Sequence, residues 1–381
     1  MGALGYLAAS VPPRMASAGA AVALPILAVQ QLGDVAVGGL LVAASLGPSV
    51  LAAPLVGTAL DRTRRPRLLV AGSGVLTAIA FAAAALIGQV PLPVVFVLLV
   101  LAGAVSPFYM GGLSSFVSGA IPDGRRAFAY DALSYNVSAV AGPALVAVIS
   151  VLLPAQAALW VLAVAAALGS LAIRAVRLRP HGRSGGSPWQ AVKGGLGMIF
   201  SHRPLAVMTA SSTLTQLGQG GLAVAAIALS VERVGSPSEG AAVVTSFAVG
   251  SLLGALYETA RPTRRSPEFV MLAGFLATGL LTALAALNFG TVWTIVAIGL
   301  SGAFTAPSTA AMLFLRNRLS PPHLKSQIFT VSAGFRASAS AGGAAVAASA
   351  AGLGGAVMVV AMGAIWIISA AVMGAYPKSE G

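Results

Sequence analysis

The sequence contains no cysteine and very little charge. Of its 381 residues, 8% are Asp, Glu, Lys or Arg, whereas 57% are hydrophobic. The absence of cysteine excludes disulfides, thiolate nucleophiles and thiolate-bound metals. Because about a quarter of the residues in a soluble domain are charged, the scarcity of charge excludes a globular enzyme in water.

Acidic residues are scarcer still than basic ones. Nine Asp and Glu stand against 22 Lys and Arg, which gives a net charge of +13. In a soluble protein this excess would suggest a nucleic-acid partner. The mean hydropathy of +0.92 points instead to a membrane protein, in which the position of each charge along the chain decides its meaning.

Long apolar runs fill most of the chain. A spanning helix needs roughly 20 apolar residues, and a transmembrane β-barrel would instead need segments of about ten residues that alternate in polarity. The first run has neither a basic start nor a small-residue cleavage site, so it is not read as a cleavable signal peptide. The runs are continuous and lie at about 4–29, 36–60, 67–88, 92–120, 127–153, 155–175, 204–230, 240–258, 268–287, 291–315, 326–350 and 354–376. The sequence therefore predicts an all-α membrane protein with 12 transmembrane helices.

The basic residues predict the orientation of these helices. Arg14 and Arg336 fall inside runs, and Arg233, beside Glu232, falls in the connection between runs 7 and 8. Every other Lys and Arg lies in a connection or terminus on the opposite side. By the positive-inside rule, both termini are then cytoplasmic. The charge excess is explained by topology, and no nucleic-acid partner is predicted.

The longest connection divides the chain into three parts. We predict an N-terminal six-helix bundle over 1–175, a cytoplasmic linker over 176–203 and a C-terminal six-helix bundle over 204–381. Apolar residues recur at helical spacing between Trp189 and Phe200, which predicts an interfacial helix. A plain flexible tether remains an equal alternative for the first half of the linker.

The two predicted bundles repeat each other in sequence. Gly57 and Asp61 precede one basic loop at the same spacing as Gly254 and Glu258 precede another, 197 residues later. A second set of matches, offset by 200 residues, pairs Pro122, Arg125, Tyr135, Ala141 and Gly142 with Pro322, Lys325, Phe335, Ala341 and Gly342. Such a duplication is typical of transporters in which two pseudo-symmetric halves rock against each other.

Two motifs then suggest a family. The loop after the second run carries Gly57, Asp61, Arg62 and Arg65 at the spacing G-x-x-x-D-[RK]-x-G-[RK], with arginine in place of the second glycine. The fifth run carries Gly142-Pro143, followed by Val-Ala where a glycine pair is usual. With these motifs the whole chain resembles transporters of the major facilitator superfamily, and in particular bacterial drug and natural-product exporters. The arginine that such exporters carry in the fourth span, linked to proton transfer, is missing here.

The resemblance implies a function. It predicts a secondary active transporter that exports a small lipophilic compound by alternating access, as a proton antiporter and monomer in the bacterial cytoplasmic membrane, with a role in drug resistance. An uptake carrier or facilitator for a small nutrient or metabolite is the alternative. No enzyme activity, cofactor or metal is expected, because the three histidines lie in loops and no nucleophile motif or paired carboxylates occur. The scarcity of embedded charge favours a neutral or weakly cationic substrate.

The resemblance also implies a conformational latch. In the family the loop motif holds the halves together, its aspartate pairing with arginines or with a helix N-terminus. Carried onto this chain, the latch consists of Gly57, Asp61, Arg62 and Arg65, and the internal repeat adds Glu258. The alternative is that the arginines only anchor the topology.

Two arginines lie inside apolar runs. Arg14 is about 15 Å into the first run, counting 1.5 Å per residue, and Arg336 is similarly deep in the eleventh. A cation at such depth costs about 2.5–3.5 kcal/mol and usually faces a cavity or a carboxylate. An anionic substrate, a structural pair or a proton site would each explain them. For Arg14, a later start of the span with a snorkelling side chain is an alternative.

Asp131 is the acidic residue that lies most clearly inside a run. It falls roughly 7 Å into the fifth run, so Arg14 is a plausible partner in the same bundle, and the pair would suit proton coupling. An interfacial pair with Arg125 or Arg126 is the alternative. Asp34, at the outer end of the second run, is a second proton candidate or a helix cap.

The remaining candidates are polar residues in the runs and one helix-bending pair. Substrate contacts are expected from Tyr109, Tyr135, Asn136, Gln216 and Gln219. Each is equally compatible with hydrogen bonding between helices. Gly142 and Pro143 are expected to loosen the fifth span, as in helices that move during transport.

Overall fold

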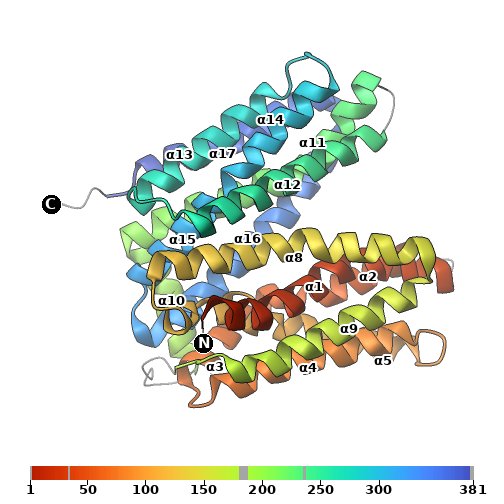
Figure 1. Cartoon of the computed structure of the whole chain (residues 1–381), viewed down its shortest axis with the longest axis vertical. Helices are drawn as coiled ribbons and strands as arrows, with labels where there is room; N and C mark the ends of the chain where they lie inside the picture. The colour runs from red at the N-terminus through yellow and green to blue at the C-terminus, as the bar shows by residue number, and fades with distance from the viewer. Residues whose placement is uncertain (1, 33–34, 180–187, 235–236, 378–381) are drawn as a thin grey trace. The chain divides into compact units, whose positions relative to one another are not determined.

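The computed structural model describes residues 2–32, 35–179, 188–234 and 237–377. The regular structure in these ranges is helical (Figure 1), and eleven helices are long and apolar enough to cross a membrane. The chain divides into two compact units. Unit 1 is Met1–Leu196 with Ser320–Gly334, and unit 2 is Gly197–Leu319 with Phe335–Gly381.

The helices of unit 1 follow the predicted runs. They are α1 (Ala3–Leu32), α2 (Val35–Leu46), α3 (Pro48–Arg62), α4 (Pro66–Ala85), α5 (Leu92–Val105), α6 (Gly111–Ser114), α7 (Val117–Ala120), α8 (Gly124–Leu152) and α9 (Ala155–Ala172). Two runs are interrupted: the second at Gly47, just before Pro48, and the fourth around a 3₁₀ turn, Ser106–Phe108. A proline at each interruption removes a backbone donor from the helical ladder.

The helices of unit 2 are α11 (Arg203–Val234), α12 (Pro237–Ala260), α13 (Pro267–Leu284), α14 (Thr291–Ala303), α15 (Thr305–Leu319) and α17 (Gly355–Gly374). Two helices cross the boundary between the units, namely α10 (Pro188–Ser201), where an interfacial helix was predicted, and α16 (Lys325–Ser349). The helix α16 covers the predicted run 326–350 but is not among the eleven candidate spans. Its polar residues, Arg336 among them, lower its hydropathy.

The two compact units differ from the two predicted bundles at α16. Residues 320–334 group with unit 1, although the sequence placed them in the C-terminal bundle. The physical reason is that the first turns of α16 pack against α3 of unit 1, through contacts with Asp61 and Gly57.

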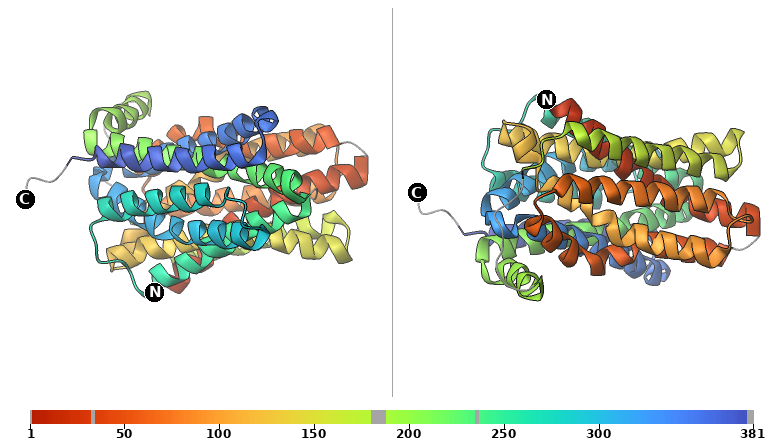
Figure 2. Two further views of the ribbon diagram at one scale, coloured as in Figure 1. Left: turned by 90° about the horizontal axis from the view of Figure 1, so that it is seen from above. Right: turned by 90° about the horizontal axis from the view of Figure 1, so that it is seen from below.

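Small residues set how closely the helices approach. A Cβ on Gly142 of α8 would lie 2.5 Å from the carbonyl oxygen of Met15 in α1. In unit 2, a Cβ on Gly343 of α16 would lie 1.9 Å from the carbonyl oxygen of Leu217 in α11. Both units therefore contain a pair of helices in backbone contact, and the helices of each unit run side by side as a bundle (Figure 2). Pro143, beside Gly142, lies inside α8, which continues to Leu152.

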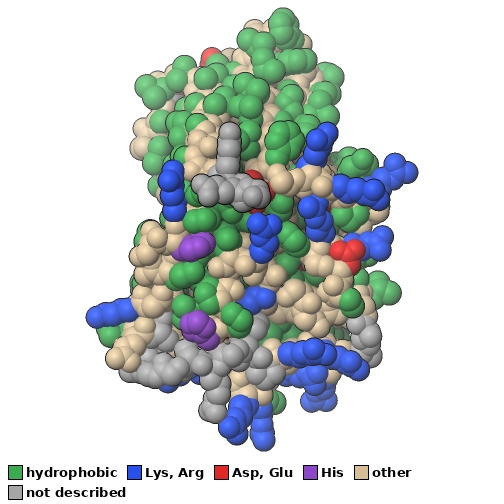
Figure 3. Space-filling view, turned by 90° about the vertical axis from the view of Figure 1, so that its left-hand side faces the viewer, with side chains coloured by type: hydrophobic (Ala, Val, Ile, Leu, Met, Phe, Trp, Pro, Cys, Tyr) green, Lys and Arg blue, Asp and Glu red, His purple; other side chains and the backbone are tan. Residues whose placement is uncertain are grey.

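The surface separates apolar sides from charged ends. Large apolar side chains are exposed along the helices, including Leu51 at 83% and Val292 at 75%, as expected where lipid replaces water. Figure 3 views helix ends at which Lys and Arg side chains far outnumber Asp and Glu. This distribution is that of a multi-pass membrane protein.

Candidate functional site

A buried ion pair joins α1 and α8 in unit 1. The Arg14 Nη1 lies 2.7 Å from the Asp131 Oδ1, and the two side chains are 1% and 0% exposed. The sequence placed both residues deep in their spans, and the structure brings them together inside the unit. Since an isolated buried charge is costly, each residue stabilises the burial of the other.

The rest of the Arg14 guanidinium is also hydrogen-bonded. Its Nε donates to the carbonyl oxygen of Tyr109, and its Nη2 donates to the carbonyl oxygen of Met110, both at 3.1 Å. These carbonyls lie at the interruption between the 3₁₀ turn and α6, and that of Met110 also accepts from the backbone N–H of Ser114 at 3.3 Å. The irregular backbone of the fourth span thus supplies ligands to the buried arginine. Its Nη1 and Nη2 also donate to Ser134 and Ser114.

Two tyrosines complete this cluster. The Tyr6 hydroxyl, from α1, donates to the same Asp131 Oδ1 at 2.6 Å, and the ring of Tyr135 stacks 3.8 Å from the Arg14 guanidinium carbon. The second oxygen, Asp131 Oδ2, is buried without a hydrogen-bond partner within the described ranges. A carboxylate with one oxygen held and the other unpartnered has a place for a proton. Sequence reasoning missed Tyr6 because an uncharged residue near the start of a span gives no signal of its own.

Other predicted contact residues of unit 1 take part in packing. The Tyr109 hydroxyl lies 2.8 Å from the Ser17 Oγ and accepts from Thr77 at 3.4 Å. Asn136 donates to the carbonyl oxygen of Ala132 in its own helix. Tyr109 is 2% exposed, so the structure places it in the interior of the unit. Asp34 lies outside the described residues.

Asp61 of the loop motif caps the N-terminus of α16. Asp61, in the last turn of α3, is 2% exposed. Its two carboxylate oxygens accept from the backbone N–H groups of Ser326 and Gln327, both at 2.9 Å. These donors belong to the first turn of α16, where N–H groups lack partners in the helix and the helix dipole attracts an anion.

Gly57 permits this cap. It lies one turn before Asp61 on α3, and a Cβ there would lie 2.4 Å from the Cα of Gln327. Only a glycine brings the two backbones so close. The two arginines of the motif differ in burial: Arg62 is half-buried, whereas Arg65 is exposed at the start of α4. Burial lowers the pKa of the Lys325 amine at the first residue of α16, and the charge of Asp61 opposes this shift.

Glu258, the repeat counterpart of Asp61, has a local partner. Its carboxylate accepts from the backbone N–H of Thr263 at 2.9 Å and from the hydroxyl of Thr263 at 2.7 Å. It therefore caps the loop that follows its own helix. Beside it, a largely apolar hollow of about 500 Å³ lies between α12, α13 and α15, with Gly254 and Arg265 in its lining.

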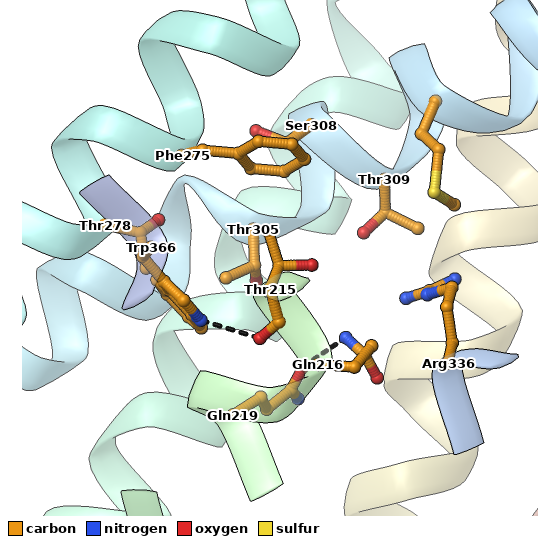
Figure 4. A pocket seen from close by; sticks show the side chains of 11 residues that line it. Thr215, Gln216, Gln219, Phe275, Thr278, Thr305, Ser308, Thr309, Arg336 and Trp366 are labelled. Atoms are coloured by element: carbon orange, nitrogen blue, oxygen red, sulfur yellow. Dashed lines mark hydrogen bonds between the residues drawn. The ribbon is translucent and has the colours of Figure 1, made fainter. Parts of the chain in front are cut away.

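Unit 2 contains a small polar cavity, shown in Figure 4. Its volume is about 20 Å³, and it is lined by Thr215, Gln216, Gln219, Phe275, Thr278, Thr305, Ser308, Thr309, Met312, Arg336 and Trp366. The predicted contact residues Gln216 and Gln219 are thus brought together with Arg336. The Gln216 amide donates to the Gln219 side chain at 2.8 Å, and the Trp366 indole donates to the carbonyl oxygen of Thr215 at 2.6 Å.

Within the described part of the chain, no group of three or more His, Asp or Glu side chains is placed to hold a metal ion. The described side chains form a buried ion pair in unit 1, a polar cavity with one arginine in unit 2 and a helix cap at the start of α16.

Comparison with known proteins gives the fold and the family. Residues 9–231 match the family model of the Major Facilitator Superfamily. An uncharacterized MFS-type transporter, y4rN of Sinorhizobium fredii, is 26% identical over 97% of this chain and 91% of its own. Among solved structures, a bacterial homologue of the iron transporter ferroportin in an outward-facing state aligns with a TM-score of 0.76 at 17% identity, covering 98% of each chain. The human organic anion transporter MFSD10 aligns with a TM-score of 0.74 at 16% identity, covering 97% of this chain and 99% of its own.

Proposed function

The chain belongs to the Major Facilitator Superfamily and transports a small substrate across a membrane; from this premise we propose that it is a proton-coupled exporter of a small lipophilic compound. In this proposal α16 is the twelfth span, the protein works as a monomer, and both termini lie in the cytoplasm of a bacterium. The arginine-rich loops support the orientation.

The observation that carries the proposal is the buried Asp131 carboxylate. One oxygen is held by Arg14 and Tyr6, and the other is buried without a hydrogen-bond partner in the described structure. During transport, Asp131 takes up a proton when its bond to Arg14 loosens and releases it when the pair reforms, because a nearby cation favours the ionised carboxylate. The missing arginine of the fourth span is replaced in this role by Arg14, whose guanidinium contacts the backbone of that same span.

Asp61 contributes the second part of the cycle. Its cap on α16 stabilises the arrangement in which the start of α16 lies against α3. A bias of a few kcal/mol is enough to set the populations of two transport states. We propose that Gly57, Asp61 and Arg62 form this latch, with Arg65 and the exposed Arg64 anchoring the loop at the cytoplasmic surface.

The test is efflux from bacteria stripped of their own exporters. The probes are fluorescent dyes of matched size in cationic, neutral and anionic forms, followed with and without a protonophore. We expect protonophore-sensitive export that Asp131→Asn abolishes, whereas the control Asp123→Asn, which changes an exposed carboxylate just before α8, leaves it intact. Protonophore-insensitive export, or full export by Asp131→Asn, would refute the coupling.

The polar cavity of unit 2 favours a second candidate. Its hydroxyl and amide side chains suit a polar group of a small metabolite taken up by the same fold. Accumulation against a gradient in the same cells, instead of efflux, would select this alternative.

A further inference from the structure

We propose that the cavity of unit 2 binds the anionic head group of an amphipathic organic acid. The inference rests on the proposed transport function and names the class of its substrate. It departs from the neutral or weakly cationic substrate that the composition suggested.

The first argument is charge. The eleven lining residues include Arg336 and no aspartate or glutamate. Arg14 contributes its charge to an ion pair with Asp131 in the interior of unit 1. The Arg336 guanidinium lines the cavity of unit 2, as Figure 4 shows. A guanidinium binds carboxylates and phosphates through paired, charge-assisted hydrogen bonds.

The second argument is the arrangement of neutral groups. Thr309 and Gln216 stand beside Arg336 in Figure 4, so an anion bound there gains further donors. Away from Arg336, the lining becomes aromatic with Phe275 and Trp366. The indole N–H is already bonded to the Thr215 carbonyl, so Trp366 offers its ring rather than a donor. The lining therefore offers hydrogen-bond donors beside Arg336 and aromatic side chains farther from it.

The third argument is size. A cavity of about 20 Å³ has room for one or two water-sized groups. That matches a carboxylate head and not a whole ligand. The remainder of an amphipathic acid would extend beyond this cavity.

The experiment measures binding to the purified full-length protein in detergent. Three probes share one ring and differ in head group: 1-naphthoate, 1-naphthamide and 1-naphthylmethylammonium. Dissociation constants are determined by equilibrium dialysis for the unmodified protein and for Arg336→Gln. The matched control is Arg318→Gln, which removes an exposed arginine near the end of α15 and changes the net charge equally.

We expect naphthoate to bind at least about tenfold more tightly than the other two probes, which corresponds to about 1.4 kcal/mol. Arg336→Gln should remove this preference, and Arg318→Gln should retain it. Arg336→Lys keeps the charge but not the paired geometry, so it should give an intermediate preference; it also serves if Arg336→Gln does not fold. Equal or tighter binding of the amide or the ammonium, undetectable naphthoate binding, or a preference that survives Arg336→Gln would each overturn the proposal.

The outcome is separable from that of the proposed function. Naphthoate binding that depends on Arg336, together with export insensitive to a protonophore, would retain the substrate class and reject proton coupling. Coupled export of only the cationic dye, together with no naphthoate preference, would do the reverse.

Discussion

Asp61 and Glu258 occupy equivalent positions in the two units, yet they bind different partners. Asp61 accepts from the N–H groups of Ser326 and Gln327, 265 and 266 residues away in the chain. Glu258 accepts from Thr263, five residues away. The same repeat thus forms a long-range cap in unit 1 and a local loop cap in unit 2.

Two arginines at positions that the repeat does not align also differ in their surroundings. In unit 1, Arg14 is neutralised by Asp131 and surrounded by hydrogen-bond acceptors. In unit 2, Arg336 lines a cavity with hydroxyls and amides. In our proposal, unit 1 carries the groups for proton coupling and latching, and unit 2 carries those for binding.

The largest expected effect is on the ion pair. Arg14→Gln leaves Asp131 as a buried charge without its cation, which should cost about 3–5 kcal/mol of stability. Arg336→Gln should cost less, because Arg336 is only half-buried whereas the Arg14 side chain is 1% exposed. Thermal unfolding in detergent measures both. Equal losses would show that the two arginines do not differ in the way described. The double variant Arg14→Gln/Asp131→Asn should lose less than the sum of the single losses.

The next effect concerns the cap on α16. Asp61→Ala should cost about 0.5–2 kcal/mol, the range for loss of a helix N-cap, and Asp61→Asn should cost less because it retains an acceptor. Since the chain has no cysteine, Thr330→Cys can report on the first turns of α16, where Thr330 is buried. We expect faster maleimide labelling of this cysteine in the Asp61→Ala background. Unchanged labelling would contradict a role for Asp61 in holding α16.

The smallest effect is expected at the equivalent position of unit 2. Glu258→Ala removes two hydrogen bonds within one loop, which should cost about 1 kcal/mol. Labelling of Thr330→Cys should stay at its original rate, because Glu258 binds Thr263 in the loop after its own helix. A labelling rate as high as in Asp61→Ala would mean that both carboxylates act on the same equilibrium.

The length of the apolar runs and the energetic cost of burying a charge made the helices and two site residues predictable from the sequence. Continuous apolar runs predicted the helices, and the depth of Arg14 and Asp131 in their runs identified two residues that must be neutralised. The interruptions at Gly47 and around Pro107 were harder to predict from the sequence, because a single proline inside an apolar run can either bend a helix or break it. The hydrogen-bond partner of Glu258 could not be predicted from the sequence either, since the loop conformation decides whether the carboxylate binds a residue of the following loop.

The Asp61 cap also affects the rate at which α16 can separate from α3. A carboxylate that holds two N–H groups must release both before α16 can leave α3, and water must then reach three newly exposed groups in a tightly packed place beside Gly57. Each 1.4 kcal/mol of this cost that appears in the barrier slows departure about tenfold. In the proposed cycle, a single aspartate would thereby set how long the protein dwells in one state, and hence how many cycles it completes each second, without contacting the substrate.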